Sequence, residues 1–176
     1  MAKTERIVDP GLLDPTKPIA DLEAIRQFNP QRFEMEQLTA ILYEDLESLS
    51  CAAVKDVRED EFWVRGHMPQ MPLMPGVIML EAVAQLASYF AQKNDLLGAE
   101  MVGFGGVDEV RFRGVVTPGD QLILMVRLLK ARRGRMLVAE FQGIVGDVTV
   151  LEGILRGIPI PVDAVKEDLA RRSVTS

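Results

Sequence analysis

The alternation of apolar and polar residues along the chain separates one long helical segment from the strand-like segments around it. Residues 76–93 are almost wholly apolar, and Pro75 and Gly76 stand at their start. Proline is favoured in the first turn of a helix, where its missing N–H costs nothing. A helix that is apolar nearly all round has to be enclosed by the rest of the protein. The pattern therefore predicts one central helix over residues 76–93.

Strand-like segments precede and follow this helix. Three short segments come before it, at residues 39–45, 50–57 and 61–65. Four longer segments, rich in Val, Ile, Leu and Phe, come after it, at residues 102–114, 121–133, 135–146 and 148–160. Turn residues separate the longer segments, and Gly146-Asp147 suits a two-residue hairpin with glycine at the first central position. These spacings predict an antiparallel meander.

The architecture follows from what must be buried. A long antiparallel sheet has one face to cover, and the apolar helix has to be enclosed. We therefore predict an α+β fold in which the antiparallel sheet wraps around the one long helix. Dimerisation could bury apolar helix surface that the sheet leaves open.

The two ends of the chain differ from this central part. Several prolines interrupt residues 1–28, which we interpret as an N-terminal arm packed on the domain, with Asp21 as the cap of a short helix. Residues 29–162 form the predicted domain. The C-terminal tail, residues 163–176, is expected to form a short helix from Asp163 to Arg172.

Composition and charge limit the possible functions. The chain has 176 residues, 48% of them hydrophobic, and a mean hydropathy of +0.10, which fits a single domain with a substantial core. Its net charge of −6 argues against binding nucleic acid or an anionic membrane over a wide surface. The N-terminus has no apolar signal core, and no segment reaches the ~20 apolar residues of a membrane span. We therefore expect a soluble cytoplasmic protein.

The chain contains one cysteine and one histidine, Cys51 and His67. A single cysteine forms no internal disulfide, and the two residues together make no zinc or iron–sulfur ligand set. The glycines at residues 103–106 lack the third glycine of a dinucleotide fingerprint. The sequence thus predicts no metal site and no bound cofactor, and Cys51, in an apolar strand-like stretch, is expected in the core.

The few polar side chains of the predicted helix share one narrow stripe. Each helical residue advances by ~100°, so Glu81, Gln85, Ser88 and Gln92 fall within about 60° of one another. One interpretation is a solvated helix edge, although such edges usually carry Lys, Arg or several Glu. The other is a polar cleft in an apolar wall, where loss of hydration favours the protonated form of Glu81 and suits it to proton donation. Gln85, one turn on, could hydrogen-bond Glu81 and fix its rotamer.

His67 lies in a proline-rich loop before the helix. Pro69, Pro72 and Pro75 are three residues apart, which matches the three residues per turn of polyproline II and predicts a stiff, extended segment. Stiffness would hold an acid or base in place without a strand beneath it. The alternative interpretation is a rigid connector with an incidental structural histidine.

The start of the helix offers a third component. Free backbone N–H groups and the positive end of the helix dipole lie there, and Gly76 lets a ligand approach the backbone closely. A carbonyl oxygen that gains negative charge would be stabilised at this point. Together with His67 and Glu81, this helix start could catalyse the removal of a proton next to a carbonyl group and the departure of a leaving group.

Two motifs in this region resemble those of a known family. The segment GHMPQMPLMPGVIMLEAVAQ places His67 and Glu81 fourteen positions apart, and VDEVRFRGVVTPGDQLIL follows it. Both resemble, in register, the (3R)-hydroxyacyl-acyl carrier protein dehydratases, which have the hot-dog fold, and the resemblance extends over about residues 29–160. Met68 and Gln70 depart from the family's usual Phe and Gly, which affects the loop and the substrate tunnel rather than the chemistry. The family can carry a cis peptide after the histidine.

The resemblance implies a reaction and a role for each site residue. The reaction is the elimination of water from a 3-hydroxyacyl thioester to give the trans-2-enoyl thioester, as in fatty acid synthesis. By resemblance, His67 is the base for the C2 proton and Glu81 protonates the departing hydroxyl. The Gly76 N–H holds the thioester oxygen, Gln85 supports Glu81, and the Leu73 carbonyl orients His67.

The resemblance also implies partners. The carrier of the substrate is acyl carrier protein, which is acidic like this chain, so docking needs a local basic patch. Candidates on one face of a strand or around a turn are Arg111, Arg113, Lys130, Arg132, Arg133 and Arg135. A merely solvated turn is the alternative. In the family, the histidine and the acid of one cleft come from different subunits, which implies an obligate homodimer, with a trimer of dimers as a further option.

Two other functions stay open on the sequence. A hot-dog thioesterase would use Glu81 to activate water and would not need His67. A non-catalytic acyl-binding protein of the same fold would use neither residue for chemistry.

Overall fold

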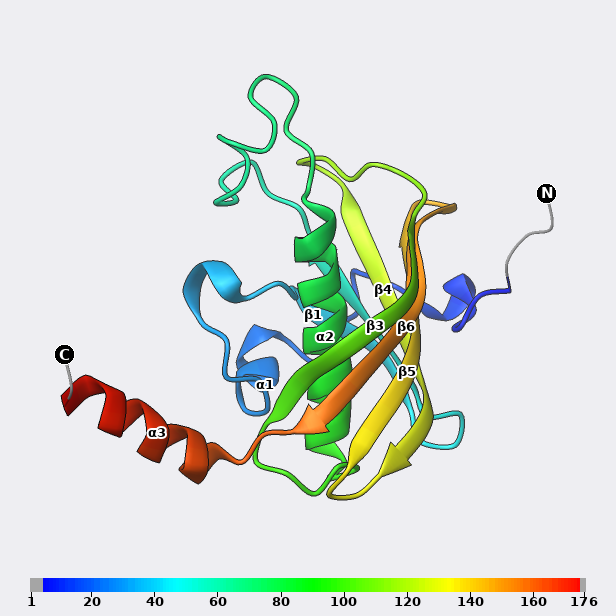
Figure 1. Cartoon of the computed structure of the whole chain (residues 1–176). Helices are drawn as coiled ribbons and strands as arrows, with labels where there is room; N and C mark the ends of the chain where they lie inside the picture. The colour runs from blue at the N-terminus through cyan, green and yellow to red at the C-terminus, as the bar shows by residue number, and fades with distance from the viewer. Residues whose placement is uncertain (1–4, 175–176) are drawn as a thin grey trace.

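A six-stranded antiparallel sheet and one long helix make up most of the protein (Figure 1). The computed structural model describes residues 5–174. The strands are β1 (Ala40–Asp45), β2 (Ser50–Asp56), β3 (Val102–Phe112), β4 (Gln121–Arg132), β5 (Met136–Val145) and β6 (Val148–Pro159). Their order across the sheet is β1-β2-β4-β5-β6-β3, and every neighbouring pair is antiparallel.

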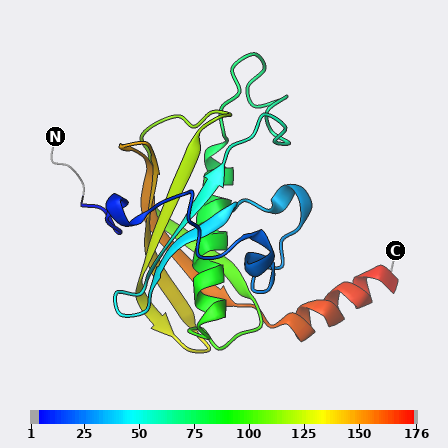
Figure 2. The same ribbon diagram turned by 180° about the vertical axis from the view of Figure 1, so that it is seen from behind.

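The sheet curves around the central helix, α2 (Gly76–Lys93), whose bounds are those predicted from the apolar run (Figures 1 and 2). Leu86 and Phe90 of this helix are fully buried, in one core cluster with strand residues such as Leu124 and Phe141. Burying one such side chain contributes roughly 1.5–3 kcal/mol. The predicted α+β hot-dog fold, a sheet wrapped around one helix, is confirmed.

The order of the strands corrects the predicted meander in one place. β4, β5 and β6 form a meander, and Val145 pairs with Val148 across a two-residue turn in which Gly146 has φ +55°. Glycine adopts this conformation without steric cost. β3, however, pairs with β6 and not with β4, so it forms the far edge of the sheet. The chain after β3 first continues along β6, since the Arg113 N–H donates to the Val150 carbonyl at 2.8 Å, and the connection to β4 is longer than a hairpin loop.

Residues 61–65 form a turn and not the predicted strand. The His67 N–H donates to the Trp63 carbonyl at 2.8 Å, which closes the turn. Trp63 is buried, and the Glu61 carboxylate forms a buried ion pair with Lys55 of β2, with 2.8 Å between Nζ and Oε1. The apolar residues here hold a loop in place through one buried ring. The local pattern therefore resembles a strand, although these residues pair with no strand within residues 5–174.

The N-terminal arm packs against the convex face of the sheet, as predicted. Val8 is buried in a small cluster with Met125 and Ile144 on this side. The Ile7 N–H donates to the side-chain oxygen of Gln142 at 3.1 Å, so the arm is held by a polar contact as well.

Further along, the arm pairs with the edge strand β1 at a single bridge, between Ala20 and Ile41. The Ile19 N–H donates to the Ile41 carbonyl of β1 at 2.8 Å, and the Ile41 N–H donates to the Ala20 carbonyl at 2.8 Å. Helix α1 (Leu22–Arg26) follows, and the Asp21 carboxylate accepts an N–H of its first turn at 3.0 Å, which confirms the predicted cap. Two short 3-10 turns also belong to the N-terminal region: η1 (Pro10–Leu12) and η2 (Phe33–Met35).

The predicted C-terminal helix is present as α3 (Val162–Val174), which points away from the sheet (Figures 1 and 2). In the part of the chain that the structure describes, none of the helices is long and apolar enough to cross a membrane.

Cys51 lies in the core on β2, as predicted. Burial raises the pKa of its thiol well above the ordinary value. Since the thiolate is the reactive form of cysteine, Cys51 is a structural residue.

We expect Val8→Ala to lower the free energy of unfolding by about 1.5 kcal/mol, because two buried methyl groups are lost. Leu12→Ala in the same arm is the matched control: Leu12 is 58% exposed, so its truncation should change stability by less than about 0.5 kcal/mol. Urea unfolding followed by circular dichroism measures both. Equal effects of the two substitutions would contradict the packing of the arm on the sheet.

Candidate active site

The histidine lies in a loop beyond the N-terminal end of α2. This loop, residues 57–75, connects β2 to α2 and projects at the top of the molecule in Figure 1. The Leu73 N–H donates to the His67 carbonyl at 3.0 Å, and Nδ1 of the His67 ring lies 2.8 Å from the Leu73 carbonyl oxygen. The Met74 N–H donates to the Val116 carbonyl at 2.8 Å. The loop therefore holds both the backbone and the ring of His67, and is itself tied to the chain that precedes β4.

The contact with Leu73 decides which nitrogen of His67 is free. A backbone carbonyl only accepts hydrogen bonds, so Nδ1 has to be the donor, and in the neutral ring Nε2 keeps its lone pair. A nitrogen of this kind can take a proton from a bound molecule. His67 is half-buried, and the peptide bond between His67 and Met68 is cis, as it can be in the dehydratases that the sequence resembles.

The proline-rich loop is not extended throughout. Met68 and Met71 exchange backbone hydrogen bonds at 3.3 and 3.0 Å, so residues 68–71 form a tight turn and the predicted polyproline II segment is wrong there. Gln70 lies in this turn with φ +67°, a left-handed conformation that costs a non-glycine residue roughly 1–2 kcal/mol. The dehydratase motif has glycine at this position, and that glycine indicates a turn.

Helix α2 begins without a side-chain cap. Pro75 is its N-cap residue and Gly76 its first residue. Within residues 5–174 the Gly76 N–H has no hydrogen-bond partner, so it is available to an oxygen atom of a ligand. A Cβ atom on Gly76 would lie 2.7 Å from the ring of Phe112. Packing of β3 against the helix start therefore also requires glycine, a reason that the local sequence does not reveal.

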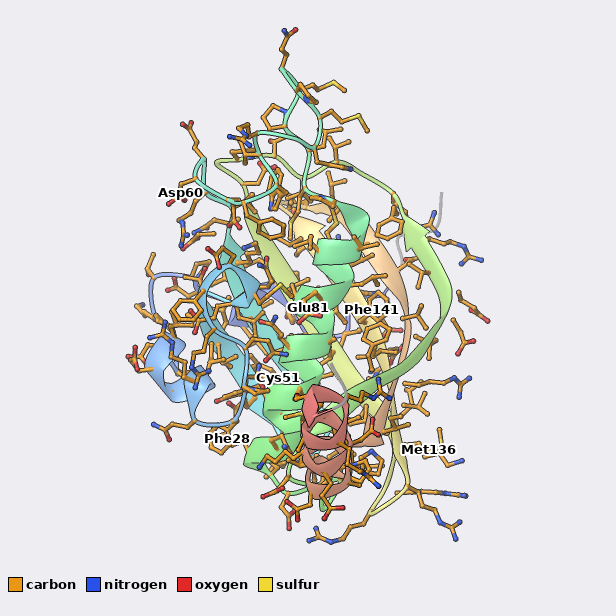
Figure 3. All side chains as sticks on the ribbon, turned by 60° about the vertical axis from the view of Figure 1, so that its left-hand side comes forward. Phe28, Cys51, Asp60, Glu81, Met136 and Phe141 are labelled. Carbon is orange, nitrogen blue, oxygen red and sulfur yellow. The ribbon has the colours of Figure 1, made fainter. Side chains whose placement is uncertain are left out.

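Glu81 lies in the second turn of α2, on the predicted polar stripe (Figure 3). Its Oε1 atom accepts a hydrogen bond from Nε2 of Gln85 at 2.8 Å. The Gln85 amide is buried and oriented by backbone groups, since its Oε1 accepts the Gln37 N–H at 2.9 Å and its Nε2 donates to the Met35 carbonyl at 2.6 Å. Gln85 can therefore present only a donor to Glu81.

A second amide near Glu81 comes from Gln31, which sequence analysis did not identify. Nε2 of Gln31 lies 3.5 Å from Oε1 of Glu81. The same segment is tied to α2 by Asn29, whose Nδ2 donates to the Gln85 carbonyl at 2.9 Å. Nothing in the local sequence predicts that Gln31 lies opposite Glu81, because this depends on how the segment crosses the helix.

A cavity of about 80 Å³ lies beside Glu81, between α2 and strands β3, β5 and β6. Gln31, Glu81 and Ser88 contribute polar groups to its lining, and Leu137 and Leu155 contribute apolar ones. Ser88 is buried. At this part of the helix the stripe therefore borders a cleft and is not a solvated edge.

The predicted site residues fall into two groups. His67, Leu73 and Gly76 belong to the loop and the helix start, whereas Glu81 and Gln85 belong to the cleft. In residues 5–174 no hydrogen bond joins His67 to Glu81, and His67 does not line the cavity beside Glu81. A single chain thus orients His67 and Glu81 by separate hydrogen bonds, but no hydrogen bond joins them within residues 5–174.

Comparison with known proteins identifies the family of the chain. The profile of the FabA-like domain matches residues 29–154. The chain belongs to the FabA-like family. Relatives in two bacteria, Streptococcus thermophilus and Streptococcus gordonii, carry the name 3-hydroxyacyl-[acyl-carrier-protein] dehydratase FabZ. Each is 34% identical to this FabA-like chain over 135 residues, which cover 77% of this chain and 94% of the relative.

Solved structures of lower identity share the fold of this FabA-like protein. The dehydratase heterocomplex ApeI:P from Xenorhabdus doucetiae has a TM-score of 0.66 at 16% identity, over 81% of this chain and 95% of that chain. The PaaI protein of E. coli has a TM-score of 0.52 at 13% identity, over 67% of this chain and 80% of that chain. At such identities the similarity supports the fold alone.

Two of the candidate docking arginines lie near the start of α2 in the FabA-like domain. Arg111 and Arg113 flank Phe112, whose ring packs against Gly76. Both form ion pairs with Glu152, at 3.9 Å for Arg111 and 2.5 Å for Arg113. The two arginines therefore belong to the same end of the molecule as the free N–H of the helix.

The other three arginines lie at the opposite end of the sheet. Arg132, Arg133 and Arg135 belong to the turn between β4 and β5, at the bottom of Figure 1. Arg133 pairs with Asp95, which follows the C-terminal end of α2, at 2.7 Å. The structure thus separates candidates that the sequence treated as equivalent.

Proposed function

We propose that this protein dehydrates (3R)-hydroxyacyl-acyl carrier protein to trans-2-enoyl-acyl carrier protein, as in fatty acid synthesis. The proposal depends on the orientation of two side chains. The contact of His67 with Leu73 leaves Nε2 of His67 free, and Gln85 holds Glu81 beside a partly apolar cleft. Both stand where the dehydratase motif has its histidine and its acid. The names of the FabZ relatives support the same reaction.

Elimination of water needs a base and an acid at adjacent carbon atoms. Nε2 of His67 takes the C2 proton, and the electron pair of the broken C2–H bond moves toward the thioester carbonyl. The Gly76 N–H stabilises the thioester oxygen as enolate character develops. The C3–O bond then breaks while Glu81 gives its proton to the hydroxyl group, which leaves as water. The electron pair that began in the C2–H bond becomes the double bond between C2 and C3.

The hydrogen bonds of Glu81 decide which of its oxygen atoms carries the transferable proton. Gln85 presents only a donor to Oε1. An oxygen that accepts this bond keeps its carbonyl character in the protonated acid, so the proton belongs on Oε2. In this mechanism Oε2 is therefore the atom that faces the departing hydroxyl.

A second copy of the chain completes the site in this proposal. The arm pairs with the β1 edge of the sheet at Ile41, but within residues 5–174 the β3 edge has no partner strand. Phe104 and Phe112 of β3 are 52% and 51% exposed. A long open edge with exposed apolar side chains favours pairing with another chain. Pairing of β3 with β3 of a second copy closes this edge and lets His67 of one subunit meet Glu81 of the other.

We expect His67→Ala and Glu81→Gln each to lower kcat/KM by at least about 100-fold, because a positioned acid or base supplies about 10²–10⁴-fold. Glu81→Gln keeps the size of the side chain, so the fold should be retained. The matched control is Glu100→Gln, at an exposed position after α2, which should keep full activity. The assay follows the ultraviolet absorbance of the conjugated enoyl thioester formed from a 3-hydroxyacyl thioester of acyl carrier protein.

The same reaction mixture is also assayed for free thiol. Enoyl product supports the dehydratase, free thiol would indicate a hot-dog thioesterase, and neither product would indicate an acyl-binding protein. Full turnover by a folded His67→Ala or Glu81→Gln protein would refute the role of that residue.

Mixing the two inactive proteins tests the shared site. A heterodimer of His67→Ala and Glu81→Gln chains has one cleft with both groups intact, so random reassortment should restore about a quarter of wild-type activity, as expected for a two-fold symmetric dimer. Each protein is denatured and refolded alone as the control. No recovery in a mixture that sediments as dimers would contradict the contribution of one group by each subunit.

We propose that Arg111 and Arg113 dock the carrier, because they lie at the helix-start end of the molecule. Arg113→Glu should raise KM for the carrier-bound substrate about 3–10-fold at low salt, and raising the salt concentration should raise the wild-type KM. KM for a pantetheine thioester, which lacks the carrier, should stay unchanged. Arg135→Glu is the matched control at the far end, and an equal effect there would place docking at the β4–β5 turn.

A further inference from the structure

A buried oxygen atom without a hydrogen-bond donor lies next to the candidate acid. Oε1 of Gln31 is buried and has no partner within residues 5–174. Asn29, Gln37 and Trp63 also have an unpaired buried atom, but none of these three residues lines the cavity beside Glu81. Buried acceptors are rarely left unpaired, because they have lost their hydrogen bonds to water. The Gln31 oxygen therefore indicates a donor outside residues 5–174.

The neighbours of Gln31 decide how its amide is oriented. Nε2 of Gln31 faces Oε1 of Glu81 at 3.5 Å, and this oxygen already accepts Nε2 of Gln85 at 2.8 Å. An atom that accepts from Gln85 is an acceptor toward Gln31 as well, so Gln31 turns its NH₂ group to it. The reversed amide would place two acceptors face to face. The unpaired group is therefore the carbonyl oxygen of Gln31.

The surroundings of Gln31 narrow the class of donor. Gln31 and Glu81 line the same cavity, and the cation that also lines it, Arg156, is paired with Asp108 at 2.6 Å. A molecule that occupies this cavity can therefore supply a donor to Gln31 that Arg156 does not. In the proposed reaction, the donor that approaches Glu81 is the 3-hydroxyl group of the substrate.

Resting on the proposed function, we propose that the carbonyl oxygen of Gln31 accepts the hydrogen of the substrate's 3-hydroxyl group, which makes Gln31 a binding residue selective for that hydroxyl. The hydroxyl oxygen accepts the Oε2–H of Glu81 at the same time. When the C3–O bond breaks, the Glu81 proton joins the hydroxyl, and the resulting water still donates its original hydrogen to Gln31. Gln31 itself neither gains nor loses a proton.

This contact predicts selectivity for the hydroxyl group. A site that hydrogen-bonds a substrate hydroxyl binds the analogue without it less well, because its own polar group is then left unpaired. A saturated acyl thioester of the same chain length lacks only the hydroxyl. We therefore expect the 3-hydroxyacyl thioester to bind about 3–10-fold more tightly than the saturated one.

The test measures this ratio without turnover. In the His67→Ala background, which lacks the base, dissociation constants are measured by calorimetry for 3-hydroxyacyl and saturated acyl pantetheine thioesters of equal length. Adding Gln31→Leu should lower the ratio about 3-fold or more by weakening only the hydroxyacyl ligand, and the preference that remains comes from the contact of the hydroxyl with Glu81. Gln27→Leu, the same change at an exposed position of the arm, is the matched control and should leave the ratio unchanged. Gln31→Met replaces Gln31→Leu if the latter folds poorly.

Three results would overturn the proposal. An unchanged ratio in Gln31→Leu would mean that Gln31 does not contact the hydroxyl. Equal weakening of both ligands would mean that Gln31 only shapes the site. A loss of dimer in sedimentation with an unchanged ratio would mean that the donor belongs to the second subunit. Absence of enoyl product from the wild-type protein would instead refute the proposed function, and the two failures are thus distinguishable.

Discussion

The buried amide of Gln85 is the contact on which the candidate site depends. Its Nε2 donates to the Met35 carbonyl and to Glu81, and its Oε1 accepts the Gln37 N–H. A buried amide with these bonds cannot turn without leaving backbone groups unpaired. The same amide therefore holds the segment before β1 against α2 and orients the carboxylate of Glu81. Any change that lifts this segment from the helix also releases Glu81.

The two edges of the sheet differ in their backbone hydrogen bonding. On the β1 edge, residues Ile19 and Ala20 of the arm take up backbone hydrogen bonds of Ile41. On the β3 edge the backbone groups stay open within residues 5–174, beside the exposed Phe104 and Phe112. This asymmetry leaves open the edge at which we propose that a second copy of the chain pairs. That edge also packs against the start of α2 through Phe112, so an interface there would adjoin the candidate site.

The proposed base and the proposed acid lie in different surroundings, one in a loop and the other on the central helix. The proposed base, His67, is half-buried and keeps the lone pair of Nε2 in its neutral form, because the Leu73 carbonyl occupies its other nitrogen. The proposed acid, Glu81, lies beside the cleft between α2 and the sheet, where Gln85 orients its carboxylate. The loop that carries His67 exposes its backbone to water, whereas the core helix that carries Glu81 does not. Each of these elements therefore gives its side chain surroundings that the other element could not. A site shared between two subunits would combine both.

The sequence by itself predicted most of the elements and the residues of the candidate site. The apolar run after Pro75 predicted α2 with its correct bounds, and the ~100° step per residue placed Glu81 and Gln85 on one stripe, because both signals are local. It did not reveal that residues 61–65 form a turn, that β3 pairs with β6, or that Gln31 lies opposite Glu81. These three depend on contacts between residues far apart in the chain: a buried ion pair to β2, the register of an edge strand, and the path of a segment across a helix. Only the tertiary structure decides such contacts, because local propensity carries no information about which distant group will be available as a partner.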